Sequence, residues 1–167
     1  MVAPHGENAS GASEDELTRA LTEQVLQGIA PEELPFLDDV LNEFGHDPDA
    51  ALKGRSREEA VGFGLELQLV APYVVAVAGA AVHFLLDILM DELKDETRAK
   101  IAETVHGWIT GKKEPGGQSP PGPPPLNAEQ ARRVRNVALV KATDLGLAED
   151  RAALLADAIV GAVMVAQ

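Results

Sequence analysis

The 167-residue chain contains no cysteine, and this absence removes disulfide frameworks, thiolate nucleophiles and cysteine-ligated metal sites together. Aromatic residues are scarce as well, because Phe, Trp and Tyr make up 4% of a sequence that is 46% hydrophobic. A core must therefore be built mainly from Ala, Val and Leu, which suit closely packed helices. We predict an all-α fold.

The N-terminal sequence, MVAPHGENASGASEDE, lacks a basic patch followed by an apolar segment and so does not predict a secretory signal. We expect the protein in the cytoplasm or at the inner face of the membrane. Its formal net charge is −13, and residues 14–49 hold eleven carboxylates against Arg19 as the only Lys or Arg. This acidic segment repels nucleic acid and anionic lipid, so a protein partner should be basic or apolar. The simpler alternative is a solvated face that maintains solubility.

The sequence contains no arrangement of residues that predicts catalysis. Its four histidines lack a second ligand at zinc spacing, and its serines lie in tails, helix caps or a linker. Nucleophile elbows and phosphate-binding glycine patterns are absent. We therefore expect a protein that is not an enzyme and that binds neither a metal nor a cofactor.

Proline and glycine are concentrated in EPGGQSPPGPPPL, residues 114–126, where the chain has few amide donors and few side chains to pack. This composition predicts a semi-extended linker. The linker divides the chain into a helical domain at residues 13–113 and a helical hairpin at residues 127–167. Residues 1–12 are expected to form a disordered tail.

Capping patterns mark where helices should begin. Ser13, Ser56 and Asn127 are each followed three residues later by Glu or Gln. The first predicts a helix ending near Gly28, and a second helix is expected from Pro31 to Gly45, followed by a turn in HDPDAALKG. The hairpin is expected to consist of two helices joined by a turn at residues 145–147.

The least polar stretch is LVAPYVVAVAGAAVHFLLDIL, residues 69–89. From Leu69 to Met90 the chain has about 22 residues, which at 1.5 Å each could cross a hydrocarbon core of roughly 30 Å. The helical spacing of apolar residues continues further, so one unbroken helix is predicted from Pro72 to Thr110. However, the apolar stretch between Pro72 and His83 has only about ten residues, a length more typical of a buried core helix. Lipid and protein both remain candidate surroundings.

This segment also has features of a self-associating helix. Small residues recur at a spacing that permits close helix–helix approach, in membranes and in soluble bundles alike. His83 and Asp87 lie four apart on one face, where they could line an oligomer axis or a pore or act as a protonation switch; the plain alternative is that water surrounds both. The predicted membrane or oligomer residues are Tyr73, Ala76, Gly79, Ala80, His83, Phe84 and Asp87.

A hairpin of about 40 residues is too small to be stable alone, so its apolar face should dock on a second copy, on the first domain or on another protein. The residues predicted for this docking are Leu154, Leu155, Ile159 and Val163. Three bases early in the hairpin should act as a latch against the acidic helices, with a contact that weakens as salt rises. These are Arg132, Arg133 and Arg135.

Two functions are consistent with these features. We favour a membrane-associated helical protein, anchored or inserted through residues 69–90, whose acidic helices and hairpin recruit protein partners. The reason is that a segment apolar on every side must be covered on every side, and short amphipathic helices cover only part of it. The alternative is a soluble α-helical adaptor or scaffold that forms homo-oligomers through the apolar helix.

Overall fold

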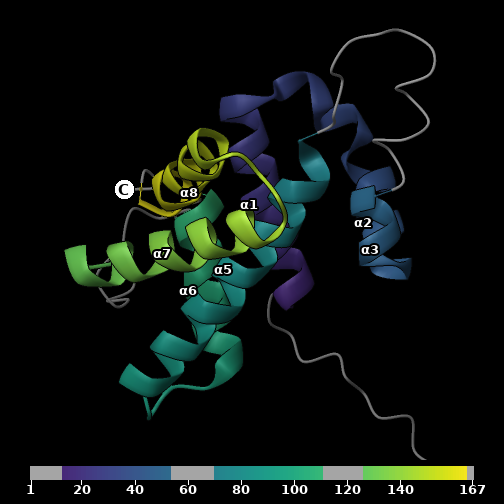
Figure 1. Ribbon diagram of the computed structural model, residues 1–167. Coiled ribbons are helices and arrows are strands. Elements are labelled where there is room, and N and C mark those ends of the chain that lie inside the picture. The colour runs from purple at the N-terminus through teal and green to yellow at the C-terminus, as the bar shows by residue number, and fades with distance from the viewer. Residues whose placement is uncertain (1–12, 54–69, 111–125, 165–167) are drawn as a thin grey trace, which may run out of the picture.

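The computed structural model describes residues 13–53, 70–110 and 126–164 (Figure 1). Helices and their connecting turns make up these residues, with no strand among them, so the all-α prediction is confirmed. The tail at 1–12, the helix expected from Ser56 and the predicted linker at 114–126, apart from Leu126, lie outside the described residues. In chain order the elements are α1 (Glu14–Ile29), the 3-10 helix η1 (Pro31–Phe36), α2 (Leu37–His46), α3 (Pro48–Lys53), α5 (Ala71–Glu92), α6 (Arg98–Thr110), α7 (Ala128–Asp144) and α8 (Glu149–Met164).

The predicted caps at the starts of α1 and α7 are confirmed. The Ser13 hydroxyl accepts a hydrogen bond from the Glu16 amide at 3.2 Å, and the Glu16 carboxylate accepts one from the Ser13 amide at 3.3 Å. Asn127 and Gln130 form the same reciprocal pair at 2.8 and 2.9 Å. Each pair satisfies two amides that a helix start would otherwise leave without a partner.

The segment from Pro31 to Lys53 differs from the prediction of one helix and a turn. Its first six residues form the tighter helix η1, and the α-helix begins only at Leu37. Pro35 explains the difference, because it has no amide to donate to the carbonyl four residues earlier. HDPDAALKG was expected to be a turn, but it includes the short helix α3, whose start is stabilised by the Asp47 carboxylate accepting from the Ala50 amide at 3.1 Å.

The single helix predicted from Pro72 to Thr110 is wrong. α5 ends at Glu92, and α6 begins at Arg98. Between them the chain turns, with the Glu96 amide bonded to the Leu93 carbonyl at 3.0 Å. The Thr97 hydroxyl then accepts from the Lys100 amide at 3.3 Å, which is a helix-capping contact. This break lets α6 pack against both α5 and α1 instead of extending away from them.

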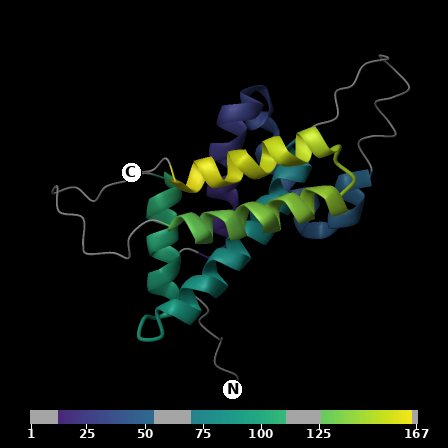
Figure 2. The same ribbon diagram turned by 60° about the vertical axis from the view of Figure 1, so that its left-hand side comes forward.

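The core is formed where α1, α2, α6 and α7 pack around α5 (Figure 1). α7 and α8 lie side by side as the predicted hairpin (Figure 2), and α8 also packs on α1 and α6. Gly146 makes the hairpin turn, with a φ of 90° that favours glycine. One continuous set of buried apolar side chains includes residues of α1, α2, α5, α6, α7 and α8. The hairpin and the helices before it therefore share a core.

Candidate functional site

The central helix α5 is long and apolar, and its surroundings decide between the two predicted functions. Within the described residues, it is the helix whose length and apolar composition would allow it to cross a membrane; the core helix of a soluble protein meets the same test. In this fold α5 is covered by four helices of its own chain. Its buried residues are Ala71, Pro72, Val74, Val75, Ala76, Val77, Ala78, Ala81, Val82, Leu85, Leu86 and Leu89.

The residues predicted to face lipid or another copy differ in how far their side chains are buried. They are the buried Ala76, the half-buried Tyr73, Gly79, Ala80 and Phe84, and the exposed His83 and Asp87. At Gly79 the neighbour is α1, because a Cβ at this position would lie 3.8 Å from the Thr18 methyl carbon. That distance is ordinary van der Waals contact. The small residue therefore lies against a helix of the same chain, and an alanine would fit there.

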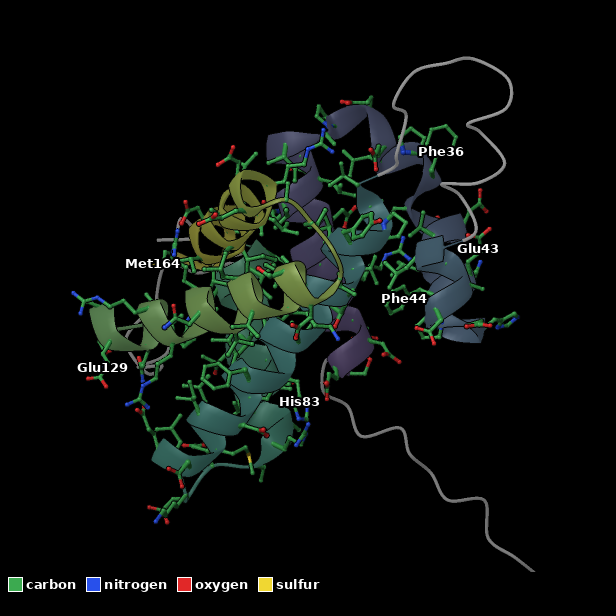
Figure 3. All side chains as sticks on the ribbon, in the orientation of Figure 1. Phe36, Glu43, Phe44, His83, Glu129 and Met164 are labelled. Atoms are coloured by element: carbon green, nitrogen blue, oxygen red, sulfur yellow. The ribbon has the colours of Figure 1, made fainter. Side chains whose placement is uncertain are left out.

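His83 and Asp87 belong to a polar cluster at the surface, near the start of α1 (Figure 3). The Nδ1 of His83 lies 3.2 Å from a Glu14 oxygen, and its Nε2 lies 3.5 Å from an Asp87 oxygen. The other Glu14 oxygen accepts from Arg98 on α6 at 3.1 Å. All four side chains are at least 40% exposed, so solvent screens these contacts and each contributes little to stability. The cluster connects α1, α5 and α6.

Glu33 of η1 is an important residue that no sequence pattern predicted. It is 7% exposed, and its two carboxylate oxygens accept hydrogen bonds from the Val70 amide at 2.9 Å and the Ala71 amide at 2.7 Å. These amides are at the N-terminus of α5, where the partial positive charge of a helix favours an anion. Glu33 therefore holds the start of the central helix to η1.

The apolar residues predicted to dock the hairpin divide into two groups. Leu155, Ile159 and Val163 are at most 3% exposed and belong to the shared core. Leu154 is 60% exposed on the opposite side of α8. The first group was predicted to dock on a second copy, on the first domain or on another protein. In the structure α8 packs against α1 and α6, which belong to the first domain of the same chain.

Two of the three arginines predicted to form a latch make ion pairs, and both pairs lie inside the hairpin. Arg133 pairs with Glu129 on its own helix at 2.6 Å, and Arg135 on α7 pairs with Asp157 on α8. The hydrogen bond from Arg135 to Asp157, together with the charge of Asp157, raises the pKa of the Arg135 guanidinium. Arg132 is exposed and pairs with no acid of the described chain. The polar contact between α7 and α5 comes instead from Gln130, whose amide donates to Glu92 at 2.7 and 2.8 Å.

No group of three or more acidic or histidine side chains within residues 13–53, 70–110 and 126–164 is arranged to hold a metal ion. In the same residues every buried side-chain nitrogen and oxygen has a hydrogen-bond partner. Comparison of the chain with protein-family models, with curated proteins and with solved structures finds no match, so function must be argued from the residues themselves.

Proposed function

We propose that this chain is a non-enzymatic interaction protein, an adaptor or scaffold, in which α5 serves as the core helix of a water-soluble bundle. The observation that carries this proposal is the covering of α5 by α1, α2, α6 and α7. Lipid is therefore not needed to bury its apolar residues. The exposed positions of His83 and Asp87 agree with this, since charged groups facing lipid would be costly.

The same packing argues against oligomerisation through α5 in the folded chain. A second copy could reach the buried residues of α5 only after α1 or α7 had moved away. Contacts with partners must then use the outer faces of the helices. The sequence from α1 to α3, residues 14–53, is strongly acidic, with eleven carboxylates and only two Lys or Arg residues. A protein partner is favoured over nucleic acid, because the latter would be repelled.

The competing function is a membrane anchor, which is favoured by the length and composition of α5. Cell fractionation of the full-length chain without detergent, followed by a carbonate wash of the membranes, distinguishes the two. We expect the protein in the soluble fraction. A matched variant, Leu21→Asp, places a charge at a fully buried position of α1 and should expose α5, so it should move to the membrane or aggregate fraction. Wild-type protein that stays in carbonate-washed membranes would overturn the proposal.

A further inference from the structure

Phe36 is exceptional in a chain that has few aromatic residues. It is 49% exposed at the end of η1, whereas the other aromatic side chains that the structure describes are half-buried. Phe44, Phe84 and Trp108 pack against the core. Figure 3 shows Phe36 at the outer edge of η1, away from α5. The bundle therefore does not need Phe36 to fill its interior.

The sequence segment that holds Phe36 is acidic. Residues 31–49 contain seven carboxylates and no Lys or Arg. Glu32 and Asp39 lie four residues before and three residues after Phe36, and both are exposed. The nearby Asp38 is paired with Arg19 of α1 at 2.6 Å. We name the exposed side chains of Glu32 and Phe36 on η1 and of Asp39 in the first turn of α2 the Phe36 face.

The contact between Glu33 and α5 holds the Phe36 face in place. The buried Glu33, which lies within the same short helix, is bonded to the start of α5 through two amides. This contact fixes η1 against the most buried helix of the bundle. A surface fixed in this way loses little conformational freedom when a partner binds.

We propose that the Phe36 face is a docking surface for a basic amphipathic segment of another protein, a proposal that rests on the interaction function above and names its surface. An apolar side chain of the partner packs on the Phe36 ring, and Lys or Arg side chains lie beside Glu32 and Asp39. The charge of the surface selects this partner over an acidic protein. The exposed aromatic ring supplies the central contact, as aromatic residues often do in protein interfaces.

The test uses the full-length protein and fluorescein-labelled helical peptides of about 18 residues, in which Leu forms one face of the helix and Lys the other. Two matched probes replace every Lys by Glu or every Leu by Ser. Fluorescence anisotropy should show that the Leu/Lys peptide binds, with a Kd that rises with salt, and that each matched probe binds at least about tenfold more weakly.

The variants Phe36→Ser and Asp39→Lys should each raise the Kd of the Leu/Lys peptide, by about tenfold or more for Phe36→Ser. The control is Leu154→Ser, which changes a hydrophobic residue of similar exposure on α8 and should leave the Kd unchanged. Equal circular dichroism and urea midpoints would show that the variants fold. The proposal is overturned if Phe36→Ser and Leu154→Ser behave alike, if the Glu-containing probe binds equally well, or if sedimentation shows a homodimer that Phe36→Ser dissociates. Fractionation tests separately whether the chain is a water-soluble bundle, as the proposed function requires, so a soluble chain without peptide binding would refute only this inference.

Discussion

Replacing Glu33 by Gln tests how strongly η1 holds the central helix. The substitution keeps the size of the side chain and one oxygen, but it replaces the second acceptor by an NH2 group that faces an amide hydrogen of α5. In the structure both oxygens are used, at 2.9 Å to Val70 and 2.7 Å to Ala71. One charge-assisted hydrogen bond is lost, and so is the attraction between an anion and a helix N-terminus.

A hydrogen bond to a charged group contributes about 1.5–3 kcal/mol, and the interaction of a charge with a helix end contributes about 0.3–2 kcal/mol. Because the remaining oxygen can still accept from one amide, we expect Glu33→Gln to lower the free energy of unfolding by about 2–3 kcal/mol. Glu32→Gln is the matched control: it removes the neighbouring charge, but Glu32 is exposed. Its effect should stay within about 0.5 kcal/mol.

The assay is urea denaturation of detergent-free protein. It is followed by far-ultraviolet circular dichroism and by the fluorescence of Trp108, the single tryptophan, which is half-buried in α6. The slope of the free energy against urea should be unchanged, so that the shift in midpoint reports stability alone. If Glu33→Gln and Glu32→Gln unfold at the same urea concentration, the contact between η1 and α5 does not have the role assigned to it.

Four further substitutions test the packing around α5 and the hairpin, each by the same denaturation assay. Gly79→Ala should raise the free energy of unfolding by about 0.5–1 kcal/mol, because alanine favours the helix and its Cβ fits against Thr18; destabilisation would contradict this packing. Leu85→Ala, at a fully buried position, should cost about 2–5 kcal/mol, while Leu154→Ala on the surface should change stability by less than about 0.5 kcal/mol, so similar effects would refute the assigned burial. Asn127→Ala removes the cap of α7 and should cost about 0.5–2 kcal/mol, and a neutral result would mean that this cap is not formed in solution.

Local sequence signals predicted the beginnings and types of several helices correctly. The capping boxes at Ser13 and Asn127 depend only on residues three apart, and the turn at Gly146 depends on a residue that tolerates positive φ. The break after Glu92 was missed because apolar residues keep helical spacing through it. Thr97, whose hydroxyl caps α6, was the available signal, and it lies in a strongly charged stretch that favours a turn.

The roles of Glu33 and Phe36 could not be read from the sequence. Glu33 lies in an acidic segment where most carboxylates are solvated, and its partners Val70 and Ala71 are 37 and 38 residues away. The outward position of Phe36 depends on the switch from a 3-10 helix to an α-helix at Leu37, which changes the faces of the residues before it. Both depend on tertiary packing and not on local pattern.

Amino-acid composition also could not decide whether α5 is surrounded by lipid or by protein. A helix that is apolar on most sides is suited to lipid and to a protein core alike, and what distinguishes them is whether enough other helices can reach it. Only the short N-terminal helices were expected to cover α5. In the structure the chain also turns back after Leu93, so that α6 packs on α5, and α7 packs on it as well.

Amide hydrogen exchange of the full-length protein in detergent-free buffer tests the central claim, that α5 is covered by its own chain in water, most directly. Amides of Val77 to Leu86 should exchange only through global unfolding, with an opening free energy equal to that measured by urea denaturation. The claim is contradicted if these amides exchange rapidly in water and become protected only when detergent micelles or lipid vesicles are added.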